Sequence, residues 1–195
     1  MKNVLLSILI PLFLFSSQTQ AGQVDASKLK KKKQTPQGLY LTAKEAHTML
    51  KSSSEKILFV DVRSQPELEF VGYANRTDVN IPYVTNDFNE FDKKKSRYKK
   101  EANSNFTVDM EKQIYKHGLT KNSKIILMCR SGSRSAKAAT LLSKVGYNNV
   151  YSVVDGFEGG KAKSGPTKGQ RTVNGWKNAG LPWSYKLNLS KTYLD

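Results

Sequence analysis

Short apolar runs that alternate with amphipathic segments constrain the fold of this chain most strongly. Ile57 to Val62, Lys124 to Met128 and Val150 to Val154 are each dominated by apolar residues. Runs of this length indicate strands buried on both faces, as in parallel sheets covered by helices. The intervening segment 134–145 has the spacing of an amphipathic helix. We therefore predict an α/β fold: a doubly wound, mostly parallel sheet with helices on both faces.

Capping and breaker residues locate the other elements. Thr42 is expected to cap a helix that runs to about Ser52, because Glu45 stands at capping-box spacing. Residues 86–105 are polar and charged without a steady period, which predicts an inserted loop. We also expect an edge strand at 39–41, a short helix at 66–70, a brief strand at 79–81 and a helix at about 108–117.

The length of 195 residues favours one domain with added terminal segments. Lys2 and the apolar run Val4 to Phe15 are typical of a secretory signal, and twelve residues are too few to span a bilayer, which takes about 20. We predict a signal peptide at 1–21, a basic flexible linker at 22–38, the folded domain at 39–185 and a C-terminal tail at 186–195. The expected location is therefore outside the cytoplasm, in a bacterial periplasm.

The formal net charge of +16 bears on the choice of partners. Lysines concentrate in the predicted linker, at 30–33, and in a second run at 93–100. In an exported chain such charge favours small anionic substrates or weak contact with an anionic membrane surface over nucleic acid. Two solubilising disordered segments would explain the same runs equally well. We expect a monomer with no nucleic-acid partner.

Cys129 is the one cysteine, so it cannot form a disulfide within the chain. A lone cysteine after an apolar strand is often a small buried hydrophobe. Its context is more specific, because it begins a short polar loop that leaves the strand and enters the helix near Arg134. At such a junction the amides of the helix N-terminus favour an anion. The loop is Cys129, Arg130, Ser131, Gly132, Ser133, Arg134 and Ser135.

These loop residues indicate an activated sulfur nucleophile. The small residues let the backbone curl so that its N–H groups converge on one point. Together with the guanidinium groups of Arg130 and Arg134, they should favour the thiolate of Cys129, whose ordinary pKa is about 8.5. The same groups would bind an oxyanion beside the sulfur.

With these motifs the chain resembles the rhodanese (thiosulfate sulfurtransferase) homology domain, and in particular its exported single-domain members. The match extends from about Thr42 to Pro182. Only the cysteine loop is specific, and the other segments support it in the same order along the chain. These are 60–63 (VDVR), 66–70 (PELEF), 80–82 (NIP), 146–147 (GY), 156–160 (GFEGG), Trp176 and 180–182 (GLP).

The resemblance implies that Cys129 takes a sulfane sulfur from thiosulfate, becomes a persulfide and passes the sulfur to cyanide or a thiol. It also implies that residues 130–135 bind the substrate and that Asp61 and Arg63 brace the loop, although a structural ion pair explains those two equally well. It implies no cofactor and no metal, and His47 and His117 lack the paired spacing of metal ligands. Tyr73 stands where the family usually has histidine, and residues 86–105 and 161–174 fit the family pattern less well.

Two alternatives remain from different classes. A cysteine phosphatase or arsenate reductase would use a similar loop, but such enzymes have five residues between cysteine and arginine, whereas four separate Cys129 from Arg134. A rhodanese-like module could instead carry a persulfide or bind a partner without turnover, because fold alone does not settle function.

Overall fold

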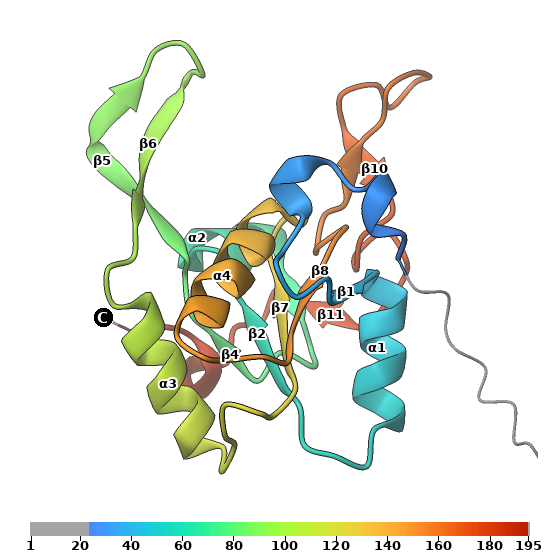
Figure 1. Ribbon diagram of the computed structural model, residues 1–195. Coiled ribbons are helices and arrows are strands. Elements are labelled where there is room, and N and C mark those ends of the chain that lie inside the picture. The colour runs from blue at the N-terminus through green and yellow to red at the C-terminus, as the bar shows by residue number, and fades with distance from the viewer. Residues whose placement is uncertain (1–23, 195) are drawn as a thin grey trace, which may run out of the picture.

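The computed structural model describes residues 24–194 and contains a central five-stranded sheet (Figure 1). All neighbouring strands of the sheet pair in parallel. Leu58 pairs with Ile125, and Ile125 pairs with Val150, so the three predicted apolar runs form its centre. The strands, in spatial order, are β1 (Tyr40–Leu41), β8 (Val150–Val153), β7 (Ile125–Met128), β2 (Leu58–Asp61) and β4 (Val79–Asn80).

Helices cover both faces of this sheet (Figure 1). On one face, α3 (Phe106–Lys116) and α4 (Ser133–Lys144) contribute to a core that includes Leu58 and Val60 of β2. On the other face, α1 (Ala43–Ser52) packs in a second core that includes Phe59 and the buried Trp176. Successive residues of β2 therefore point into opposite cores, as expected for a strand buried on both faces. This arrangement confirms the predicted fold class.

The start of α1 confirms the predicted capping box. The Glu45 N–H donates to Thr42 Oγ1 over 3.2 Å, and the Thr42 N–H donates to Glu45 Oε2 over 2.7 Å. The pair satisfies two backbone donors that the first turn of a helix leaves without partners. The short helix α2 (Gln65–Val71) begins with a similar box between Ser64 and Glu67.

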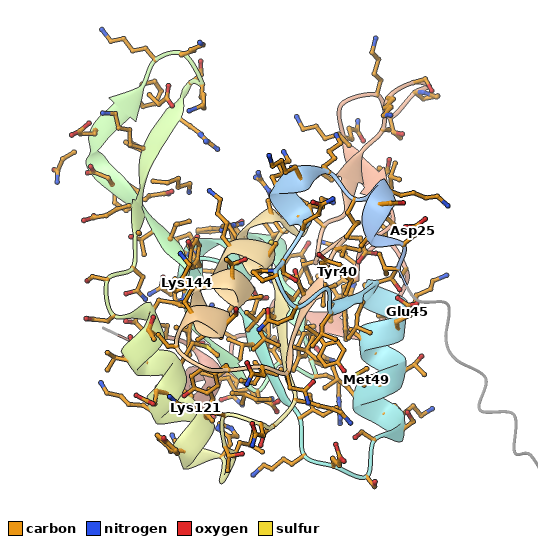
Figure 2. The ribbon with its side chains drawn as sticks, in the orientation of Figure 1. Asp25, Tyr40, Glu45, Met49, Lys121 and Lys144 are labelled. Atoms are coloured by element: carbon orange, nitrogen blue, oxygen red, sulfur yellow. The ribbon has the colours of Figure 1, made fainter. Side chains whose placement is uncertain are left out.

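The prediction of an inserted loop at 86–105 is wrong for most of that segment. Residues 84–102 form an antiparallel hairpin of β5 (Val84–Asp92) and β6 (Arg97–Ala102), which projects from the body of the domain (Figure 1). Side chains extend from the hairpin into open space (Figure 2). Tyr98 makes edge-on ring contacts with Phe88 and Phe91. Because the hairpin buries neither face in a core, its sequence lacks the apolar alternation that predicts a strand.

The described part of the predicted flexible linker is folded against the domain, which corrects that prediction. It contains the short 3-10 helices η1 (Ala26–Lys28) and η2 (Lys31–Lys33). Lys33 Nζ donates to the Val154 carbonyl over 2.7 Å, and the Thr35 N–H donates over 2.7 Å to Oη of the buried Tyr40, labelled in Figure 2. The predicted signal peptide at 1–21 lies outside the described residues. Among residues 24–194, no helix has the length and apolar character needed to cross a bilayer.

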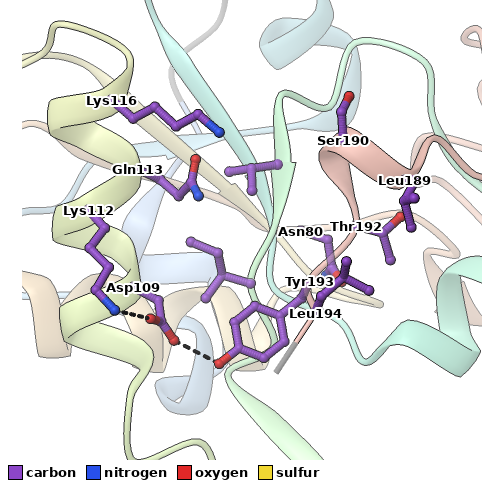
Figure 3. A pocket seen from close by; sticks show the side chains of 12 residues that line it. Asn80, Asp109, Lys112, Gln113, Lys116, Leu189, Ser190, Thr192, Tyr193 and Leu194 are labelled. Carbon is purple, nitrogen blue, oxygen red and sulfur yellow. Dashed lines mark hydrogen bonds and ion pairs between the residues drawn. The ribbon is translucent and has the colours of Figure 1, made fainter.

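Residues 186–194 of the predicted C-terminal tail also contact the domain. They include the 3-10 helix η3 (Leu189–Lys191). Lys191 Nζ donates to the Thr77 carbonyl, and the Tyr193 hydroxyl donates to Asp109 Oδ2 on α3, both over 2.7 Å. With α3 and β4 this segment encloses a pocket of about 290 Å³ that Cys129 does not line (Figure 3). Two small antiparallel pairings complete the fold: β3 (Tyr73–Ala74) with β11 (Trp183–Ser184), and β9 (Gly160–Lys161) with β10 (Arg171–Val173).

Candidate active site

Cys129 follows β7 directly and lies at the carboxyl edge of the sheet, where α4 begins four residues later. The chain curls back through Gly132, whose φ is +93°, and the Gly132 N–H donates to Cys129 Sγ over 3.1 Å. A Cβ built on Gly132 would lie 2.1 Å from the Val154 carbonyl oxygen, so only glycine fits. The loop therefore aims a backbone donor at the sulfur, and such a donor stabilises negative charge there.

The Cys129 side chain is buried, with 1% of the residue exposed. Its Sγ lies 3.6 Å from Ser135 Oγ, which accepts a hydrogen bond from Ser152 Oγ over 2.9 Å. The residue packs with the core, as a small hydrophobe would. A purely structural cysteine does not explain the amide donor or the pocket that Cys129 lines.

That pocket has a volume of about 560 Å³, and Cys129 contributes to its floor. The predicted loop residues Arg130, Ser131, Ser133 and Arg134 line it as well. Its walls come from several separate elements that flank the carboxyl edge of the sheet. The remaining lining residues are Lys32, Glu67, Tyr83, Val84, Arg97, Lys100, Lys137 and Arg171.

Arg134 makes a two-point ion pair with Glu67 of α2. Both guanidinium–carboxylate distances are 2.6 Å. Burial alone would raise the pKa of Glu67, but the hydrogen bonds and charge of Arg134 outweigh it and lower that pKa to about 2. Burial likewise opposes the charge of Arg134, yet the pairing with Glu67 raises the pKa of Arg134. The charge of Arg134 is thus largely neutralised within the site.

Arg130 differs from Arg134 because it forms no ion pair with a described acidic residue. Its Nε is buried without a hydrogen-bond partner among the described residues. Buried polar groups normally have such partners, so Arg130 differs from Arg134 in having hydrogen-bonding capacity that no described residue uses.

Asp61 and Arg63 do not line the pocket, and the side chains of both are fully buried. They form an ion pair with 2.7 Å between Arg63 Nη2 and Asp61 Oδ2. The guanidinium carbon of Arg63 lies 4.1 Å from the centre of the Phe157 ring, and the Phe157 N–H donates to the Cys129 carbonyl over 2.8 Å. The pair is therefore a buried ion pair outside the pocket, and Phe157 connects it to the cysteine loop.

The structure brings the predicted loop residues together around one sulfur, whereas the predicted supporting residues Asp61 and Arg63 lie outside the pocket. Gly132 and Ser135 contact the sulfur, and the other loop residues face the pocket. The sequence alone did not place Glu67 in the site, although it lies in a segment that supports the resemblance. The sequence showed the basic runs of the hairpin and of η2 but gave no sign that their side chains line the pocket.

Comparison with known proteins agrees with this geometry. The family model of the rhodanese-like domain matches residues 42–163. An uncharacterized protein of Rickettsia conorii is 32% identical over 141 residues, which cover 72% of this chain and 93% of that protein. Thiosulfate sulfurtransferase GlpE of Actinobacillus succinogenes is 38% identical over 58 residues, 30% of this chain and 38% of that enzyme.

A solved structure supports the same assignment. The crystal structure of Rv0390 from M. tuberculosis superposes with a TM-score of 0.57 at 28% identity and covers 75% of this chain and 97% of that one. The parallel sheet, the cysteine loop at its carboxyl edge and the family match over most of the domain agree with one another. The chain belongs to the family of rhodanese-like domains.

Proposed function

We propose that this protein is a sulfurtransferase that carries a sulfane sulfur on Cys129 as a persulfide. The observation that carries the proposal is the position of Cys129 Sγ, which accepts the Gly132 N–H at the floor of a cationic pocket. The partial match to thiosulfate sulfurtransferase GlpE supports a thiosulfate-type donor.

The proposed reaction has two steps. The Cys129 thiolate attacks the outer sulfur of thiosulfate, the sulfur–sulfur bond of thiosulfate breaks, and sulfite leaves with the bonding electrons. An acceptor such as cyanide then attacks the outer sulfur of the persulfide, which releases thiocyanate and restores the thiolate. The amide of Gly132 stabilises negative charge on the sulfur, and Arg130 offers a cation to the donor anion.

Mass spectrometry of the protein after incubation with thiosulfate tests the first step. We expect one added sulfur on Cys129 in the wild type and none in Cys129→Ala. Thiocyanate formation from thiosulfate and cyanide tests the second step and should be lost in the same variant. An added sulfur without thiocyanate would identify a carrier module instead, and no added sulfur would refute the proposal.

We further propose that the protein is exported and acts in the periplasm. The support is the signal-like composition of residues 1–21. The mass of the purified mature protein would test this, since cleavage before Gly22 is expected. A full-length mass in a secreting host would contradict it.

A further inference from the structure

The hairpin of β5 and β6 carries three aromatic side chains that contact one another away from the core. Tyr98 lies edge-on to Phe88 and to Phe91, with ring centres 5.1 and 5.8 Å apart. The exposed fractions are 66% for Phe88, 53% for Phe91 and 45% for Tyr98, and none of the three belongs to either core of the described residues. Single exposed rings are common, but rings gathered in one place mark a binding surface. We call these three residues the aromatic cluster.

An irregularity in β5 puts both phenylalanines on one face of the hairpin. Along a regular strand, residues three positions apart, such as Phe88 and Phe91, point to opposite faces. The pairing register shifts between Asp87 and Phe91, and both rings contact Tyr98. Bulges that redirect side chains in this way are conserved features of strands rather than defects. The backbone thus gathers rings that regular pairing would separate.

A cationic turn adjoins the aromatic cluster. It consists of residues 93–96, all exposed, and one residue pair separates it from the pair of Phe91 and Tyr98. Lys95 forms an ion pair with Asp92 over 2.8 Å. Within residues 24–194, no carboxylate forms an ion pair with Lys93 or Lys94. The end of the hairpin therefore carries uncompensated positive charge beside exposed rings.

The other face of the hairpin is ionic and internally paired. Successive residues of a strand point to opposite faces, so Lys99 points away from the face that holds Tyr98. Its ammonium group forms an ion pair with Glu90 of β5. The aromatic cluster and the lysines of the turn are thus the groups at this end of the hairpin that a partner would contact.

Rings beside cations are typical of segments that bind anionic lipid surfaces. The rings lie at the level of the headgroups, and the lysines extend to the negative charge. The net charge of +16 disfavours a second copy of the chain as partner, because two cationic turns would repel each other. Nucleic acid would need open ring faces on which bases stack, whereas the edge-on contacts cover part of those faces.

We propose that the end of the β5–β6 hairpin binds an anionic membrane surface, with the aromatic cluster among the headgroups and Lys93 and Lys94 on their negative charge. The hairpin projects from the body of the domain, so its turn can reach a flat surface (Figure 1). Lys100 of the same hairpin lines the pocket of Cys129, so binding would hold that pocket beside the lipid. The inference does not depend on a persulfide at Cys129.

Cosedimentation with lipid vesicles tests the proposal on the purified full chain. We expect binding to vesicles of phosphatidylglycerol and phosphatidylcholine, mixed at about 3:7, to exceed binding to phosphatidylcholine alone by at least about tenfold at low salt. Equal binding to both kinds of vesicle, or binding to neither, would overturn the proposal.

A matched pair of variants tests the aromatic cluster. Phe88→Ser with Phe91→Ser removes two of its rings, and we expect binding to the anionic vesicles to weaken at least about tenfold. Phe70→Ser is the control, because Phe70 is 75% exposed on α2, outside the hairpin, and its loss should leave binding unchanged. An equal loss in the control would show that the aromatic cluster has no special role.

A second pair separates the turn from the net charge of the chain. Each lysine near an anionic surface strengthens binding roughly fivefold, so Lys93→Gln with Lys94→Gln should weaken it by at least about tenfold. Lys44→Gln with Lys51→Gln removes the same charge from exposed positions on α1 and should change binding by less than about twofold. Equal losses in the two double variants would overturn the assignment to the hairpin.

Two further readouts separate this inference from other partners and from the proposed function. Single-stranded oligonucleotide that binds in a manner dependent on Phe88 and Phe91, without vesicle binding, would overturn the membrane assignment in favour of nucleic acid. Sulfur loading of Cys129 that persists in the hairpin variants shows that they are folded. Vesicle binding by a wild type that acquires no sulfur would refute the sulfurtransferase proposal and support the membrane surface.

Discussion

Arg134 of α4 holds Glu67 of α2 through two parallel hydrogen bonds of 2.6 Å beside the candidate active site. The same carboxylate accepts hydrogen bonds from the backbone N–H and the hydroxyl of Ser64 at the start of α2. One side chain thus joins the helix after β2 to the helix after the cysteine loop. The pairing keeps the two carboxyl-edge segments together and leaves Arg130 as the loop arginine without an acidic partner among the described residues.

Glu67→Gln should destabilise the protein by about 3 kcal/mol at neutral pH, since the pKa of Glu67 is lowered from 4.5 to about 2 in the folded state. A lowered carboxyl pKa contributes stability above pH 4.5 that is lost as the pH falls towards 2. Urea unfolding of the wild type and the variant should therefore differ at pH 7 and converge only as the pH approaches 2. Glu69→Gln, on the exposed side of the same helix, is the control and should change little. A constant difference at every pH would contradict the assigned role of the carboxylate.

Arg63→Met should cost about 3–5 kcal/mol, because it leaves the Asp61 carboxylate buried without its partner. The double variant Asp61→Asn with Arg63→Met removes that stranded charge and should be more stable than Arg63→Met alone. Chemical denaturation of the three variants measures this coupling. Strictly additive losses would show that the two residues act independently.

The sequence predicted the sheet and most helices because their signals are local. Apolar runs identified β2, β7 and β8, and the box between Thr42 and Glu45 marked the start of α1. The cysteine loop was also visible, since a strand, a small-residue turn and a helix follow one another without interruption. The hydrogen bond from the Gly132 N–H to Cys129 Sγ requires the left-handed conformation of residue 132, which glycine adopts readily.

The rest of the site depends on contacts between distant segments. Glu67 and Arg134 lie 67 positions apart, and no local pattern pairs them. Lys100 reaches the pocket only because residues 84–102 fold as a hairpin, and neither face of that hairpin is buried in a core. Its charged run has the composition of a solvated loop, so composition alone did not distinguish the two.

Sulfur loading from thiosulfate should slow as salt increases, because the pocket attracts the anion through exposed cations. The screening length falls from about 10 Å at 0.1 M salt to about 3 Å at 1 M. We expect kcat/KM for thiosulfate to fall several-fold over this range. Lys100→Gln with Lys137→Gln should show a shallower dependence, measured by thiocyanate formation. An unchanged slope in that variant would show that Lys100 and Lys137 do not attract the donor.

Gly132→Ala should disrupt the sulfur site more than Gly118→Ala, which introduces backbone strain without a steric clash. Both Gly132 and Gly118 have positive φ, but a Cβ at Gly118 meets no atom within 4 Å, whereas one at Gly132 would lie 2.1 Å from the Val154 carbonyl oxygen. Gly118→Ala should therefore cost only about 1 kcal/mol of strain and retain activity. Gly132→Ala must displace the loop, and because it withdraws the N–H from Cys129 Sγ, we expect sulfur loading to slow on the order of 100-fold. Mass spectrometry of samples quenched at successive times measures the rate of sulfur loading, and urea unfolding measures the loss of stability. Equal loading rates in the two variants would show that the amide of Gly132 does not assist the sulfur.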